Sequence, residues 1–181
     1  MKGLKIAVVF LAGGLLFSGG ISLSGFFFSP ADDVFKSVYG QSAYELGAEG
    51  ELEMGRFGVF AGLHYMQKKG TTTYTKEEVS LRLIPIIAGL RFYPVKGGTS
   101  FFLEGGGGNW NYKEEASFAT ANGNITGYFA GAGLEFKMTG SFYFRFIMRY
   151  QFVKKEFGEG EESYKSDLSG INTGLGLLLR F

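Results

Sequence analysis

The segment 142–152, FYFRFIMRYQF, alternates between two kinds of side chain. Phe142, Phe144 and Phe146 share one parity, and Arg145 and Arg149 share the other. Because successive side chains of a β-strand point to opposite faces, this pattern predicts a strand with one aromatic face and one face that carries arginines. A soluble sheet would bury the aromatic face, whereas a membrane barrel would place it against lipid and turn the arginines inward.

Other segments repeat this division, and their second face is built from glycine and charge. In the segment 43–54, four glutamates share a parity with Gly47, opposite Leu46 and Leu52. In the segment 171–181, Gly174, Gly176 and Arg180 lie opposite a row of leucines. An eight-stranded barrel has an interior just wide enough to be filled by side chains, and glycines would make room there for long charged ones.

Eight segments alternate in this way, and turn residues separate them at regular intervals. The predicted strands are 21–28, 43–54, 57–68, 79–93, 99–112, 125–138, 141–154 and 167–181. The connections between them alternate strictly between long, polar segments and short turns. No convincing helical period follows residue 20. The chain is therefore predicted to be all-β, an eight-stranded antiparallel up-and-down transmembrane β-barrel with short periplasmic turns and long external loops. The soluble alternative is an eight-stranded lipocalin-type barrel, which would not show this loop asymmetry.

The N-terminus has the pattern of an export signal. A short basic start precedes the apolar run 6–17, and Ser18 and Gly20 suit a cleavage site after Gly20. We expect residues 1–20 to be a cleaved signal peptide and residues 21–181 to form the barrel domain in a bacterial outer membrane. The alternative is an anchoring or buried helix, but the apolar run is short for a membrane span and contains two glycines.

Composition excludes several kinds of site. The sequence has no cysteine, so neither a disulfide framework nor a thiolate metal site is available. Its net charge of +1 and lack of a basic stripe give no reason to expect a nucleic-acid partner. The single histidine, His64, is expected in a lumen hydrogen-bond network, so we expect no metal, no cofactor and no enzymatic activity.

The inward-facing charges are expected to pair with one another, because an unpaired charge in a poorly hydrated interior is very costly. Arg145 and Arg149 should look toward Glu104 and Glu135, and Glu104, Glu135, Arg145 and Arg180 are expected to contact one another. The predicted lumen ion-pair cluster comprises Glu45, Glu49, Glu51, Glu53, Arg91, Glu104, Glu135, Lys137, Arg145, Arg149 and Arg180.

One predicted strand breaks the alternation. Leu81 and Leu83 share the parity of Arg91, whereas Leu90 has the other. Pro85 lies between the two sets and cannot donate a ladder hydrogen bond, so we expect a bulge near residues 84–86 that restores Ala88, Leu90 and Phe92 to lipid. In the next strand, Trp110 and Tyr112 share the parity of Glu104, but the glycine run 105–108 could hide a slip, which leaves their facing open.

The chain ends on Phe181, and at this point it resembles the small outer-membrane β-barrel family typified by the OmpA membrane domain and OmpX. The resemblance is one of pattern over residues 21–181 and includes the segment IPIIAGLRFYP. It implies that Gly176, Leu179 and Phe181 form the assembly signal that the barrel-insertion machinery reads. Gly174 stands where that signal usually has a polar residue.

The resemblance implies a structural or surface-interaction role, in adhesion or envelope integrity, with a lumen filled by ion pairs rather than an open pore. The expected partners are the lipid bilayer, lipopolysaccharide, the insertion machinery and a host or envelope protein bound through the external loops. The alternatives are an OmpW-like transporter or binder of small apolar molecules and a lipid A-modifying enzyme. A hydrophobic lumen mouth would favour the OmpW-like role, and Phe26, Phe28 and Phe60 are the residues that hint at one.

Overall fold

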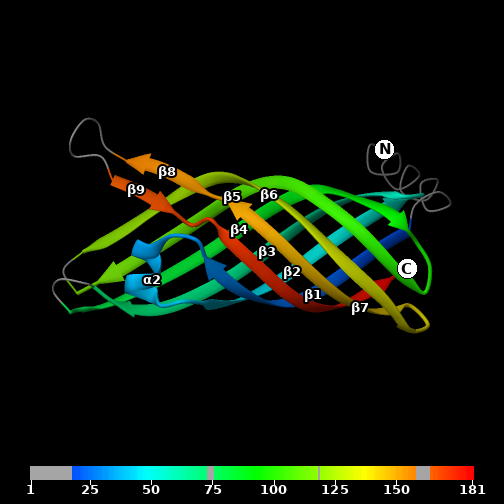
Figure 1. Cartoon of the computed structure of the whole chain (residues 1–181), viewed down its shortest axis with the longest axis horizontal. Coiled ribbons are helices and arrows are strands. Elements are labelled where there is room, and N and C mark those ends of the chain that lie inside the picture. Colours follow the sequence, from blue (N-terminus) through cyan, green and yellow to red (C-terminus); the bar gives the residue numbers. More distant parts are fainter. Residues whose placement is uncertain (1–17, 73–75, 118, 158–163) are drawn as a thin grey trace, which may run out of the picture.

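The chain forms a closed barrel of eight antiparallel strands in a computed structural model that describes residues 18–72, 76–117, 119–157 and 164–181 (Figure 1). Around the barrel the order is β1, β10, β7, β6, β5, β4, β3, β2, so each strand pairs with its neighbour in the up-and-down chain order and β1 closes on β10. The barrel strands are β1 (Ser18–Pro30), β2 (Ala43–Met54), β3 (Phe57–Thr71), β4 (Glu78–Val95), β5 (Thr99–Ala116), β6 (Thr120–Thr139), β7 (Phe142–Phe152) and β10 (Gly170–Arg180).

Both ends of the barrel domain lie at one end of the cylinder, here called the turn end (Figure 1). Gly19 and Phe181 exchange two backbone hydrogen bonds there, of 2.8 and 2.9 Å. The tight turns at this end use Gly55 and Gly140 with φ of 61° and 52°, a conformation that glycine adopts without strain. The connections after β1, β3, β5 and β7 lie at the opposite end, the loop end, as the alternating loop pattern predicts.

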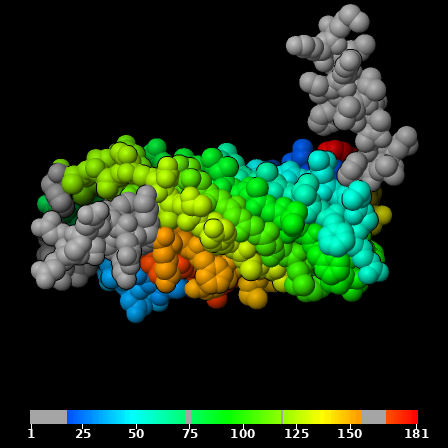
Figure 2. Space-filling model, turned by 90° about the horizontal axis from the view of Figure 1, so that it is seen from above, coloured from blue at the N-terminus to red at the C-terminus, as the bar shows by residue number. Residues whose placement is uncertain are grey.

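The outer wall is apolar. Leu46 and Leu90 expose 68% and 64% of their surface, and similar side chains face outward on every barrel strand. In the space-filling view the visible face of the wall is closely packed, and α2, in blue, lies near the loop end (Figure 2). A wall of exposed leucine and phenylalanine is stable against lipid rather than water. Within the described residues, no helix has the length and apolar character of a membrane span.

The bulge predicted near residues 84–86 is wrong. The register between β3 and β4 is the same on both sides of Pro85, with Leu63 opposite Ile86 and Met66 opposite Leu83. Leu81 and Leu83 therefore face the lumen, where they are 3% and 1% exposed. No slip is needed because the lumen itself becomes apolar toward the loop end.

The glycine run 105–108 hides no slip either. Pairing between β4 and β5 is continuous from Val79–Ala116 to Phe92–Leu103 and shifts only beyond Phe92. Trp110 therefore points inward with Glu104 and is 2% exposed. Tyr112 lies on the same face and packs, partly buried, against the apolar core.

The loop end holds structure that the alternation did not predict. Helix α2 (Asp33–Tyr39) follows β1 where the sequence predicted a polar loop. Its N-cap, Asp32, accepts a hydrogen bond from the Phe35 amide at 2.7 Å, and Phe35 and Tyr39 are buried one helical turn apart. Because α2 is only seven residues long and buries only this pair of side chains, its sequence shows no helical period.

The predicted loops after β5 and β7 are also partly strand. Strands β5 and β6 continue to Ala116 and from Thr120, so most of the predicted loop 113–124 is a hairpin. Between β7 and β10, strands β8 (Lys154–Phe157) and β9 (Tyr164–Asp167) pair as a separate two-stranded sheet. Of the predicted signal peptide 1–20, residues 1–17 lie outside the described residues, and Ser18–Gly20 form the first residues of β1. Cleavage after Gly20 stays a prediction.

Candidate functional site in the barrel lumen

The lumen is filled by two layers of side chains. A charged layer occupies the half toward the turn end, and an apolar layer occupies the half toward the loop end. The structure brings ten of the eleven predicted cluster residues into the lumen, namely Glu45, Glu49, Glu51, Glu53, Arg91, Glu104, Glu135, Arg145, Arg149 and Arg180. They reach it because glycine or small residues occupy the neighbouring inward positions.

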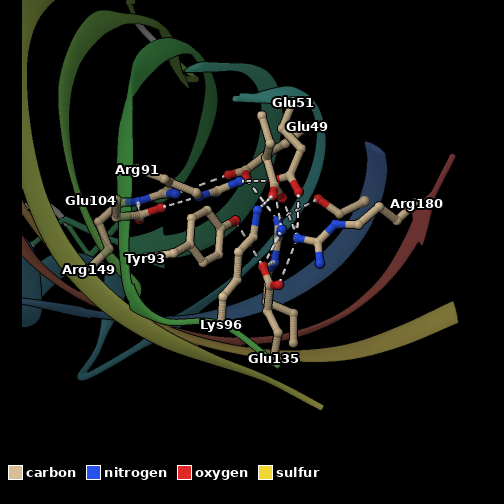
Figure 3. Close-up of polar contacts among 12 residues, drawn as sticks. Glu49, Glu51, Arg91, Tyr93, Lys96, Glu104, Glu135, Arg149 and Arg180 are labelled. Carbon is tan, nitrogen blue, oxygen red and sulfur yellow. Dashed lines mark hydrogen bonds and ion pairs between the residues drawn. The ribbon is translucent and has the colours of Figure 1, made fainter. Parts of the chain in front are cut away.

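Arg91 forms ion pairs with three carboxylates of the charged layer (Figure 3). Its guanidinium pairs with Glu49 and Glu51 of β2, and its Nε donates to Glu104 Oε2 of β5 at 3.0 Å. Arg91 is 1% exposed, so these contacts replace its hydration. Three carboxylates around one planar guanidinium use the fork geometry that makes arginine suited to such pairs.

Arg145 and Arg149 extend the network from β7. Arg145 Nη2 lies 2.6 Å from Glu135 Oε1 and 2.7 Å from Glu51 Oε2. Arg149 Nε donates to Glu104 Oε1 at 2.7 Å. The two arginines thus look toward the two predicted carboxylates, Arg145 toward Glu135 and Arg149 toward Glu104.

Arg180, on β10, completes the network at the turn end. It pairs with Glu53 and lies 2.8 Å from Glu135 Oε2 (Figure 3). The expected group of four is therefore divided. Arg145 and Arg180 share Glu135, whereas Glu104 contacts Arg91 and Arg149 instead.

Lys137 is placed differently from the prediction. Its side chain is exposed, and it lies beside the register shift between Lys137 and Thr139, where β6 turns toward β7. Its inward parity places it beyond the end of the closed lumen, so it is not part of the charged layer. Lys96, in the turn after β4, supplies a lysine to the charged layer instead. Its Nζ lies 2.5 Å from Glu53 Oε2.

The sequence did not predict the hydrogen bonds that two further lumen residues, Tyr93 and Asn172, form. Tyr93 is buried and donates its hydroxyl to Glu135 at 3.2 Å, and its parity with Arg91 is the signal that could have identified it. Asn172 donates to Gln151 at 2.8 Å above the charged layer. Lys96 had no such signal because it lies in a turn, where alternation ends.

His64 lies where the two layers meet. Its Nδ1 is 2.6 Å from Glu45 Oε1, and its Nε2 is 3.4 Å from Glu49 Oε1. Both ring nitrogens therefore face carboxylates rather than a serine hydroxyl. With His64 and Lys96 counted, the six lumen glutamates face six partners that can carry positive charge, four of them arginines.

Aromatic rings join the charged layer to the apolar one. The Arg91 guanidinium lies 4.0 Å from the Phe60 ring centroid, and that of Arg149 lies 4.7 Å from Phe129. Beyond these rings the lumen is mostly apolar as far as α2, with the hydrogen-bonded pair Asn172 and Gln151 among its buried side chains. The buried apolar layer includes Phe28, Phe35, Tyr39, Met66, Leu81, Leu83, Ile87, Trp110, Ile125, Val153 and Leu168.

The predicted assembly residues lie on the last strand and at its end. Gly176 faces the lumen opposite Ser24 of β1, whereas Leu179 and Phe181 face outward and are exposed. This placement presents an aromatic terminus on the outer wall at the turn end.

A closed eight-stranded barrel with an apolar outer wall and a charged lumen defines the class of small outer-membrane β-barrels. No protein-family model matches the chain, and no curated protein matches it either. Solved structures do resemble it. The outer membrane protein OprG from Pseudomonas aeruginosa superposes with a TM-score of 0.74 at 13% identity, over 92% of this chain and 96% of that one.

Two other outer-membrane proteins resemble the chain less closely. A major outer membrane protein from Thermus thermophilus has a TM-score of 0.64 at 9% identity, over 91% of this chain and 99% of that one. Ail from Yersinia pestis, in complex with the heparin analogue sucrose octasulfate, has a TM-score of 0.56 at 15% identity, over 91% of this chain and 97% of that one. At these identities the likeness concerns the fold. The predicted fold is confirmed, and it is that of bacterial outer-membrane barrels.

Proposed function

We propose that this protein is an integral outer-membrane barrel with a closed lumen, which acts through its loop end as a structural or surface-interaction protein. The observation that carries the proposal is the filled lumen. Ion pairs link β2, β4, β5, β6, β7 and β10 across the turn half, and buried apolar side chains occupy the loop half. A solute would have to break both layers to pass.

Gene deletion separates this role from that of a pore. Loss of a closed structural barrel should leave the uptake of small hydrophilic solutes unchanged and make the envelope leakier to detergent. Loss of a diffusion pore should lower solute uptake instead. A deletion strain with slower sugar uptake and normal detergent resistance would therefore overturn the proposal.

The loop end is proposed to face the cell exterior. Two outward-facing cations, Arg82 and Lys113, lie directly opposite each other there on β4 and β5. Cations at the rim of an apolar wall suit the phosphates of lipopolysaccharide. Ail, a barrel of this fold, was solved in complex with a heparin analogue, which supports a ligand-binding role for such a barrel. A host or envelope protein is the second proposed kind of partner.

Delivery to the membrane is proposed to follow the usual route for such barrels. Residues 1–20 would serve as the export signal, and Gly176, Leu179 and Phe181 would be read by the barrel-insertion machinery. The exposed, outward-facing side chain of Phe181 supports this, because it is free to contact another protein. Replacing Phe181 with Ala should lower the amount of folded barrel in the outer membrane while synthesis stays the same.

A second candidate function is the capture of small apolar molecules at the loop end, as in OmpW-like barrels. The specific observation is the apolar layer, which the inward facing of Leu81 and Leu83 extends to the barrel mouth. Faster entry of a small apolar solute into cells that produce the protein would support this candidate. The proposal includes no enzymatic activity, and unchanged lipid A after overexpression would agree with it.

A further inference from the structure

A cavity of about 200 Å³ lies at the barrel mouth, between α2 and the inner wall of the loop end. One side is formed by Phe35 and Tyr39 of α2, whose ring centroids are 4.9 Å apart. The other side is formed by Leu81 of β4, Tyr112 of β5 and Leu168. An apolar cavity of about 150 Å³ is large enough to hold benzene, so this one accommodates a single ring with a short substituent.

The polar lining of this cavity is acidic. Asp32, Glu114 and Asp167 line it, and none of the described lining residues is basic. Asp167 is paired with Lys154 at 2.8 Å. Asp32 and Glu114, by contrast, form no ion pair within the described part of the chain.

Asp32 and Glu114 each accept a hydrogen bond that fixes the position of the carboxylate. Asp32 accepts from the Phe35 amide at 2.7 Å, and Glu114 accepts from the Tyr39 hydroxyl across the mouth. Burial, together with the Glu114 carboxylate, raises the pKa of Tyr39, so this phenol remains a donor at neutral pH. The Tyr39 hydroxyl thus holds the Glu114 carboxylate at the cavity wall, where none of the described cations pairs with it.

We propose that this mouth cavity binds a small organic cation whose apolar part is about the size of one aromatic ring. The ring packs between α2 and Leu81, and the ammonium group faces Glu114 and Asp32. The aromatic faces of Phe35 and Tyr39 add cation–π attraction. This inference rests on the second candidate function, small-molecule capture at the loop end, and specifies the chemical class of the molecule.

The test uses the full-length barrel refolded in detergent and two probes of nearly equal shape, 2-phenylethylammonium and neutral 2-phenylethanol. Titration followed by calorimetry or NMR should show tighter binding of the cation. Glu114→Gln keeps an acceptor for Tyr39 but removes the charge, and it should weaken cation binding about tenfold while leaving the neutral probe unchanged. Glu115→Gln is the matched control, because Glu115 faces outward and pairs with Lys113, and it should change neither affinity.

A second variant tests the place of binding without touching a carboxylate. Val34 lines the cavity from an exposed position on α2, so Val34→Trp should fold and narrow the cavity, which weakens binding of both probes. Equal affinity for the two probes, with no effect of Glu114→Gln, would overturn the cation inference and leave apolar capture standing. Binding of neither probe would overturn the inference and count against capture as well.

Discussion

Arg145 on β7 meets Glu51 on β2 across the lumen, with Nη2 2.7 Å from Oε2. The two residues are 94 positions apart in the chain, and β10 and β1 lie between their strands around the barrel wall. Their contact therefore spans the interior rather than following the sheet. It joins parts of the wall that no backbone hydrogen bond connects directly.

Removing Arg145 should destabilise the barrel strongly. Arg145→Met leaves Glu51 and Glu135 with fewer partners in a dry interior, where losing one member of a buried pair costs about 3–5 kcal/mol. Urea unfolding in liposomes, or the temperature of the heat-modifiable gel shift, measures the loss. Lys137→Met, at the exposed position, is the control and should change little. The double variant Arg145→Met with Glu135→Gln also removes the charge of an acid that has lost one of its two arginine partners, so it should recover part of the stability. An unshifted transition in Arg145→Met would show that the pair contributes nothing.

The facing of β4 can be measured directly, because the chain has no cysteine of its own. Nitroxides attached to Leu83→Cys and Leu81→Cys should be shielded from both oxygen and a water-soluble relaxation agent. Nitroxides at Ile86→Cys and Leu90→Cys should collide with oxygen dissolved in the bilayer. Oxygen contact at residue 83 comparable with that at residue 90 would restore the predicted bulge and contradict the continuous register.

The alternation predicted most of the barrel because each wall residue has only two environments, lipid or lumen. It assigned Arg91, Arg145 and Arg149 to the interior correctly, since charge excludes the lipid face. For Leu83 the parity with Arg91 was correct, and the predicted bulge was the error. Leucine suits both a lipid face and an apolar lumen, so its apolar character alone gave no reason to move it to lipid. The alternation missed α2, whose Phe35 and Tyr39 are buried by tertiary contacts that a seven-residue helix cannot show in its sequence.

The lumen should tolerate no added volume at Gly133. A Cβ atom there would lie 2.5 Å from the Phe146 carbonyl oxygen and 2.6 Å from a Phe102 ring carbon. Gly133→Ala should therefore destabilise the barrel by about 1–3 kcal/mol, the usual cost of overpacking. Gly50→Ala is the matched control on the outer wall, where nothing lies within 4 Å of the added atom. Equal unfolding transitions for both variants would mean that the lumen is loosely packed.

The base of the β8–β9 hairpin should respond to acid. Burial acts to raise the pKa of Asp167, but hydrogen bonds from Lys154 and Ser169 outweigh it, so the pKa lies below its usual value. The Asp167–Lys154 pair therefore stabilises the folded protein at pH values above the unfolded pKa of about 4. This stabilisation is lost as the pH falls through the lower pKa of the folded state. An NMR titration of the Asp167 carboxyl should give a midpoint below about 3.9, and Lys154→Met should raise it, whereas the distant Lys113→Met should not. A midpoint at or above that ordinary value in the unaltered chain would contradict the geometry.

Single-barrel conductance in a planar lipid bilayer tests the closed lumen most directly. The layered interior predicts that the full-length refolded protein leaves the baseline current unchanged, although heat modifiability shows it to be folded. An open porin recorded in the same bilayer supplies the positive control. Stable, stepwise currents at the nanosiemens level from single copies of this barrel would contradict the closed lumen and the function proposed from it.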